Sequence, residues 1–300
     1  MSLPSPIAIL ETFKRAWGDL GPRYKKVILS GGYLICLAML AWAADETALQ
    51  VDISRIRPAY LVVSLLFGCI YFLSQGIAWG DLSSADSKVR ALSNWSRTQA
   101  LHFLPGGVFT PASRAMTVTG KTSRKAAVVA FEAVLGASVV VFVGAVGLAT
   151  SIDPIWWLAT LGGPIGIAAV VVLGKRSSVK PREVMTASCW YFVGRTAFCL
   201  AAYFAQFAIR PQGAFWPIIA ASASAWLVGY VALFAPGGLG VREVVYISII
   251  TLPGIGSHIS RGLASSGALS ARLTMSVAEI LVLGAFGWST RGRKVVPEDT

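Results

Sequence analysis

The sequence predicts an all-helical bundle that crosses a membrane about eight times, and three observations support this. Hydrophobic residues make up 55% of the 300-residue chain and charged residues only 13%, which is too apolar for a soluble core. Lys and Arg gather between the apolar runs, as the positive-inside rule expects. Two Pro-Gly-Gly runs interrupt apolar segments, which predicts broken or re-entrant helices.

The expected elements follow from these patterns in chain order. Residues 1–26 form a basic cytoplasmic leader, residues 27–290 a single transmembrane domain, and residues 291–300 a cytoplasmic tail. The leader is basic enough to stay inside, and residues 7–20 could form an interfacial helix. The apolar runs predict spans over residues 27–44, 58–80, 126–149, 154–173, 183–208, 212–235, 241–252 and 263–290.

The segments between the spans set the orientation. Four segments are assigned to the cytoplasm: residues 1–26, 81–125, 175–182 and 291–300. They hold 19 of the 26 Lys and Arg residues, so the protein is expected in the cell inner (plasma) membrane with its amino terminus inside. Residues between Trp95 and Phe109 are too apolar for a loop and too few to cross, which favours a re-entrant hairpin.

One segment leaves two topologies open. If residues 241–252 cross the membrane, the basic tail lies inside and the count is eight, which is the preferred interpretation. If they re-enter instead, the tail lies outside and the charge rule is broken. The same choice decides whether the repeats described next are parallel or inverted.

The two breaks share their surroundings, which indicates a diverged internal duplication with repeat-like halves around 93–150 and 231–290. Proline lacks the amide donor that a helix interior needs, and glycine permits conformations that other residues avoid. Each break precedes an arginine and then a long apolar helix with one carboxylate. The break residues are Pro105, Gly106, Gly107, Pro236, Gly237 and Gly238, the arginines are Arg114 and Arg242, and the carboxylates are Glu132 and Glu279.

Ionisable residues at membrane depth are costly and therefore mark candidate sites. A helix that begins after a break points free amides and the positive end of its dipole at a ligand, and arginine can clamp a phosphate with two hydrogen bonds. We therefore predict a lipid-headgroup pocket. Its candidate residues are Arg114, Arg195, Arg242, Glu132, Glu279 and Arg272, with Arg272 and Glu279 expected on one helix face.

Simpler interpretations exist for most of these residues. Arg195 and Glu132 could form a structural ion pair, and Arg114 could be an ordinary positive-inside residue. Arg242 and the adjacent Glu243 could be a self-neutralising surface pair. The two histidines, His102 and His258, invite a proton-relay hypothesis, but isolated interfacial histidines are usually amphipathic filler.

Composition also limits other classes of function. The net charge of +12 belongs to segments flanking the spans, so no nucleic-acid partner is expected. No cofactor or metal site is expected, and no nucleotide-binding loop, zinc-protease helix or serine elbow is visible, which disfavours an enzyme. The four cysteines fall in predicted spans, where no disulfide framework is visible: Cys36, Cys69, Cys189 and Cys199.

Over about residues 27–290 the chain resembles the flippase-type transmembrane domain of the lysylphosphatidylglycerol synthase/flippase family. The resemblance rests on Leu104-Pro105-Gly106-Gly107 with Arg114, on the Glu132 helix, and above all on Pro236-Gly237-Gly238-Leu239-Gly240-Val241-Arg242-Glu243. It implies movement of a lipid between leaflets. The family's aminoacyl-transferase domain has no counterpart in these residues, so aminoacylation is not implied.

The leading hypothesis is a flippase or facilitator for a phosphate-containing lipid, either a phospholipid or a polyprenyl-linked lipid. The arginines would bind phosphate, and the carboxylates would offset charge or bind a cationic headgroup. The alternative is a non-transporting membrane subunit that presents polyprenyl phosphate to a glycosyltransferase. A transferase using Glu132 or His102 as base ranks third, and homo-oligomerisation stays open.

Overall fold

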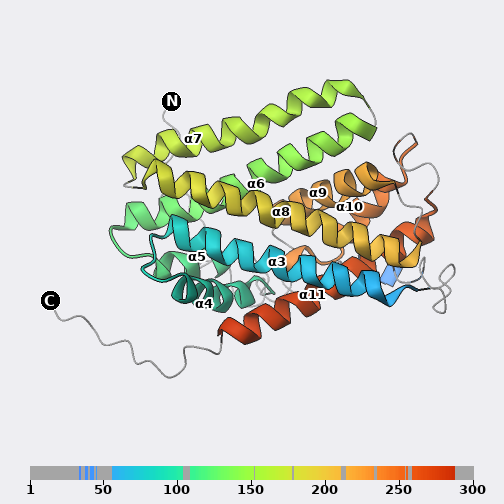
Figure 1. Ribbon diagram of the computed structural model, residues 1–300, viewed down its shortest axis with the longest axis horizontal. Coiled ribbons are helices and arrows are strands. Elements are labelled where there is room, and N and C mark those ends of the chain that lie inside the picture. Colours follow the sequence, from blue (N-terminus) through green and yellow to red (C-terminus); the bar gives the residue numbers. More distant parts are fainter. Residues whose placement is uncertain are drawn as a thin grey trace.

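The computed structural model describes most of the chain as helix (Figure 1). The described residues are 34, 38–39, 41–43, 45, 56–103, 109–151, 153–177, 179–210, 214–232, 235–253, 255 and 259–287. Five helical segments are long and apolar enough to cross a membrane, so the protein is a multi-pass membrane protein with five candidate spans in this part of the chain. The predicted leader and tail and most of the first expected span lie outside the described residues.

The long helices match the expected spans closely. They are α3 (Pro58–Leu82), α6 (Thr122–Ser151), α8 (Pro181–Ile209) and α11 (Arg261–Gly287), together with α7 (Gly162–Arg176), which the short 3-10 helix η3 (Pro154–Leu161) precedes. Proline stands at the first turn of both α3 and α8, where its missing amide costs no hydrogen bond.

Helices α3 and α8 lie side by side along their whole length and run in opposite directions (Figure 1). At one end the Arg57 amide donates to the Ala208 carbonyl at 2.9 Å. At the other end the Ser84 hydroxyl donates to the Glu183 carboxylate at 3.0 Å. These contacts define an Arg57 end and a Ser84 end of the molecule.

The other long helices run between the same two ends. Near the start of α6, Arg124 donates to the Ser84 hydroxyl at 2.6 Å, so α6 begins at the Ser84 end. Near the start of α11, the Leu263 carbonyl accepts from Gln206 of α8 at 3.1 Å, so α11 begins at the Arg57 end.

A first helical hairpin enters from the Ser84 end. It consists of α4 (Lys88–Gln99), the 3-10 helix η2 (Ala100–Phe103) and α5 (Phe109–Thr117). At the start of α4, Lys88 forms an ion pair with Asp81 at the end of α3. The chain then runs inward to η2, and α5 leads back to the start of α6. Residues 104–108 lie outside the described residues, so the predicted break at Pro105, Gly106 and Gly107 is not placed.

A second helical hairpin enters from the Arg57 end. It consists of α9 (Phe215–Val231), the 3-10 helix η4 (Pro236–Gly238) and α10 (Val241–Ile250). Phe215 at the start of α9 packs edge-on against Tyr203 of α8, with ring centroids 5.0 Å apart. After the break, α10 turns back along α9, and Tyr246 donates to Gln206 at 3.3 Å.

The segments predicted as two separate crossings, residues 212–235 and 241–252, therefore form the two arms of one hairpin. Helix α10 has 10 residues, which span about 15 Å at the usual rise. Its end returns toward the Arg57 end, where α11 begins and crosses the molecule. Charge counting could not show this, because it assumed that the segment before the second break crosses by itself.

Small residues allow α6 and α9 to pack closely, and this gives a stability prediction. A Cβ at Gly147 would lie 2.9 Å from the Ala220 amide nitrogen and 3.1 Å from its Cα, both rigid backbone atoms. Gly147→Leu should force the helices apart and cost roughly 3 kcal/mol or more, which lowers the melting temperature in detergent by at least about 5 °C.

Gly284→Leu in α11 is the matched control, because a Cβ there meets nothing within 4 Å. Its melting temperature should stay within about 1 °C of wild type, as for surface substitutions generally. Equal losses in both variants would contradict the close α6–α9 contact.

Candidate functional site

The two interrupted regions meet at the centre of the molecule. His102 in η2, just before the first break, lies against Gly237 in η4, where an added Cβ would be 2.8 Å from its Nε2. Arg272 of α11 donates from both terminal nitrogens to the Gly237 carbonyl at 3.4 Å. Gly237 and Gly238 have φ of 60° and 70°, a region that favours glycine.

A cavity of about 480 Å³ surrounds this junction. All six ionisable residues that the sequence singled out line it, and they come from five different helices: Arg114, Glu132, Arg195, Arg242, Arg272 and Glu279. Gly237 and Gly238 of the second break line it as well. The ionisable residues singled out from the sequence therefore line one shared cavity.

The first of two ion pairs in the cavity joins Arg114 to Glu132. Arg114 also donates to the side-chain oxygen of Gln99 at 2.6 Å. Arg114 is only 8% exposed. The structure pairs Glu132 with Arg114 and not with Arg195, and a buried, paired Arg114 does not fit the interpretation as an ordinary positive-inside residue. Because Glu132 balances its charge, Arg114 is a weaker candidate phosphate ligand than we expected.

The second ion pair joins Arg272 to Glu243, with Nε and Oε1 3.8 Å apart. Glu243 is 3% exposed, so the suggested surface pair of Arg242 with Glu243 is wrong. Adjacent residues on a helix point in different directions, which is why Glu243 faces α11 while Arg242 faces α9.

The other two arginines share one aromatic ring. The guanidinium carbon of Arg195 lies 3.6 Å from the centroid of the Trp226 ring, and that of Arg242 lies 5.9 Å from it. Arg195 also donates to the Tyr71 hydroxyl at 2.8 Å. Among the described residues, no carboxylate lies within 4 Å of either guanidinium group.

Several donors that line the cavity are buried without a hydrogen-bond partner in the described part of the chain, and four of them belong to the two unpaired arginines, a tryptophan and a glutamine. These four are the Nε atoms of Arg195 and Arg242, Nε1 of Trp226 and Nε2 of Gln75. Buried polar groups are nearly always paired, so such a group of donors favours a ligand rich in acceptor oxygens. We call these four residues the arginine site.

Glycines make room for both arginine side chains. A Cβ at Gly136 of α6 would lie 2.9 Å from a terminal nitrogen of Arg195. A Cβ at Gly229 would lie 2.4 Å from Cγ of Arg242, and one at Gly238 would lie 2.7 Å from its Nε. The second break therefore both turns the chain and accommodates Arg242.

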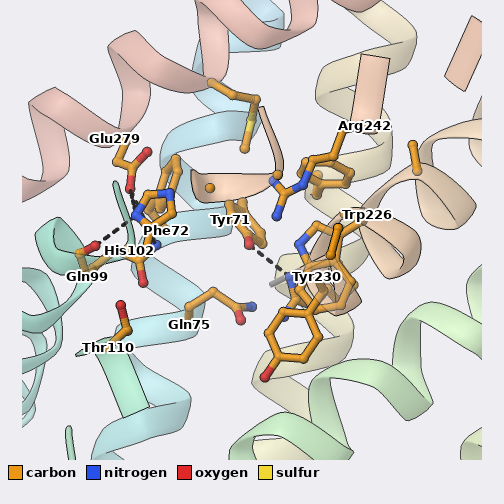
Figure 2. Close-up of a pocket in the computed structure, with 18 of the residues that line it drawn as sticks. Tyr71, Phe72, Gln75, Gln99, His102, Thr110, Trp226, Tyr230, Arg242 and Glu279 are labelled. Carbon is orange, nitrogen blue, oxygen red and sulfur yellow. Dashed lines mark hydrogen bonds and ion pairs between the residues drawn. The ribbon is translucent and has the colours of Figure 1, made fainter. Parts of the chain in front are cut away.

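A separate group lies across the cavity, around Glu279. Its Oε1 is 3.4 Å from the Gln99 side-chain nitrogen and 3.4 Å from Nδ1 of His102, which also lies 2.8 Å from the Gln99 carbonyl. Figure 2 shows Glu279, His102 and Gln99 on one side of the cavity and Arg242, Trp226 and Tyr230 on the other. His102 is thus not interfacial filler, while His258 lies outside the described residues.

No protein-family model and no curated protein matches this chain. The chemistry of the site therefore has to be judged from its own residues. Among the described residues, no cluster of three or more His, Cys, Asp or Glu side chains could hold a metal ion.

Sequence reasoning missed several residues of the site. Trp226 carries no signal in an apolar helix, since a tryptophan there is equally consistent with packing. Gln75 and Gln99 did carry a signal in the sequence, because an amide side chain within or beside an apolar segment needs a hydrogen-bond partner. Counting such amides with the charged groups would have found both.

Proposed function

We propose that this protein is a lipid flippase that moves a phosphate-bearing lipid between the leaflets of the membrane. The observation that supports this best is the pair of guanidinium groups of Arg195 and Arg242 on Trp226, for which the described residues supply no carboxylate within 4 Å. Two such cations in a mostly buried cavity are costly unless an anion binds between them.

Phosphate fits this site better than a simple halide. Guanidinium groups present their donors in a planar fork that matches phosphate oxygens, and the Trp226 and Gln75 nitrogens add two further donors. Helix α10 begins at Val241, next to Arg242, so its amino-terminal dipole also favours an anion here.

The proposed membrane topology has two re-entrant hairpins. The α4–η2–α5 hairpin enters from the Ser84 end and α9–η4–α10 from the Arg57 end, and each is followed by a long helix that carries a cavity carboxylate, Glu132 or Glu279. This arrangement supports an inverted repeat of the kind that forms central sites in transporters. Because α9 and α10 both belong to one hairpin, α11 runs from the Arg57 end to the Ser84 end, and the proposal assigns the Ser84 end to the cytoplasm, since residues 81–125 are basic.

The cavity suits a lipid headgroup that crosses while its acyl chains remain in the bilayer. Polar groups at the hairpin junction would replace the water that the headgroup loses, which lowers the cost of crossing hydrocarbon. Three residues that line the cavity from α5, α6 and α9 are also exposed, which supports a lateral opening: Pro111, Ala130 and Tyr230. The resemblance to the lysylphosphatidylglycerol synthase/flippase transmembrane domain is part of this proposal.

Reconstitution into vesicles tests the proposed function. A membrane-impermeant reductant destroys outer-leaflet label, so protein-free vesicles should lose about half of a fluorescent phosphatidylglycerol. Vesicles with the protein should lose nearly all of it, because inner-leaflet lipid moves outward. A labelled polyprenyl phosphate, measured in parallel, separates the two lipid classes.

Binding of either lipid without leaflet exchange would contradict transport. That result would favour the non-transporting subunit that presents polyprenyl phosphate to a glycosyltransferase. A protein that neither binds nor exchanges either lipid would contradict both functions.

A further inference from the structure

Glu279 differs from the other two carboxylates in the cavity. Glu132 pairs with Arg114 and Glu243 with Arg272, whereas no Lys or Arg of the described residues lies within 4 Å of Glu279. Glu279 is 6% exposed, and the Gln99 side chain and His102 both approach the same oxygen, Oε1. A buried carboxylate without a cationic partner is costly in its charged form, which favours exchange of a proton.

His102 makes this carboxylate part of the hairpin junction. Nδ1 lies 2.8 Å from the Gln99 carbonyl, which can only accept, so this nitrogen carries a hydrogen. Nε2 faces Gly237 of the second hairpin. The imidazole is therefore held between Glu279 and the second break, and a proton entering the pair can reside on the carboxylate or on the ring.

The charged groups around this pair come from five of the helices that line the cavity, and Tyr71 of α3, Tyr230 of α9 and Tyr246 of α10 are further titratable groups there. Arg272 lies on the same helix as Glu279, Arg242 and Glu243 on α10, Arg114 on α5, Glu132 on α6 and Arg195 on α8. The two ion pairs cancel their own charges. The unpaired charges are thus the positive Arg195 and Arg242 and, when ionised, the negative Glu279.

We propose that Glu279 and His102 form a proton-binding site, and that proton binding there is linked to phosphate binding at the arginine site. This inference rests on the proposed function. With Glu279 ionised, the unpaired groups carry a net charge of one positive unit, and protonation raises it to two. An anion should therefore bind more tightly to the protonated cavity, and by reciprocity its binding should draw in a proton.

The test uses dihexanoyl phosphatidylglycerol, whose phosphodiester keeps one negative charge between about pH 5 and pH 8, so a change in affinity over this range comes from the protein. Its affinity for the purified full chain in detergent is measured by calorimetry. Wild type should bind about tenfold more tightly at the acidic end, within the roughly 5- to 150-fold range of coupling between sites. Calorimetry in two buffers with different heats of ionisation should show proton uptake on binding.

Variants assign the effect to the pair. Glu279→Gln should keep the tight, low-pH affinity over the whole range and bind without proton uptake. Glu183→Gln is the control, since its carboxylate lies at the Ser84 end outside the cavity, and it should keep the pH dependence. His102→Gln should shift the midpoint of the pH dependence.

Three outcomes would overturn the inference. Wild-type binding that does not change with pH and takes up no proton would do so without any variant, and would leave the proposed function intact. An unchanged pH dependence in Glu279→Gln would do the same. Absence of binding at every pH would overturn this inference and the proposed function together.

Discussion

Arg242→Ala should reduce lipid exchange in reconstituted vesicles by about 100-fold. The guanidinium of Arg242 lies over Trp226 and is held between Gly229 and Gly238, so its loss removes one of the two cations of the arginine site. Losing one charged partner of a buried contact costs about 2–5 kcal/mol, and each 1.4 kcal/mol is about tenfold. The measurement is the rate of inner-leaflet label loss at equal protein per vesicle.

Two substitutions serve as controls for this prediction. Arg90→Ala removes an arginine whose side chain is 66% exposed and paired with Asp86, and it should leave exchange unchanged. Arg242→Lys should recover only a small part of the rate, because an ammonium group cannot donate in a planar fork. If Arg242→Ala exchanges lipid at the wild-type rate while remaining folded, Arg242 does not belong to the site.

Glu132→Leu should have the largest effect on stability. It leaves Arg114, which is 8% exposed, without its carboxylate, and breaking a buried ion pair in this way typically costs about 3–5 kcal/mol. The melting temperature in detergent should fall by about 10 °C. The double variant Arg114→Leu with Glu132→Leu should recover most of this loss, since an apolar pair removes the unbalanced charge.

The double variant also tests the assignment of Arg114. If the Arg114–Glu132 pair is structural, the double variant should still exchange lipid at a substantial rate. Loss of lipid binding in a stable double variant would instead restore Arg114 as a phosphate ligand. Failure of the second substitution to recover stability would contradict the ion pair itself.

The charged residues singled out from the sequence line one cavity for a simple physical reason. A charge within an apolar helix is so unfavourable that it must face a cavity or a partner, and so the amino-acid pattern alone was enough to assign Glu132, Arg195 and Glu279 to one chamber. Likewise, Pro236-Gly237-Gly238 had to interrupt a helix, and the structure shows a 3-10 turn there.

Pairing could not be predicted in the same way. Whether Glu132 contacts Arg114 or Arg195 depends on how α5 and α8 lie against α6, and no local pattern reports that arrangement. The pairing of α9 and α10 in one hairpin was missed for a related reason, because apolarity shows that a segment lies at membrane depth but not whether it turns back. His102 was underrated because its distance from Glu279 in the sequence hid their contact.

Native mass spectrometry of the lipid that the purified protein retains tests the central claim most directly. The wild-type chain should carry a phosphate-containing lipid, about one per protein, and the double variant Arg195→Gln with Arg242→Gln should lose it while Arg90→Gln keeps it. A double variant that retains the same lipid at wild-type occupancy would contradict a phosphate site on Trp226. So would a wild-type protein that retains only lipids without phosphate.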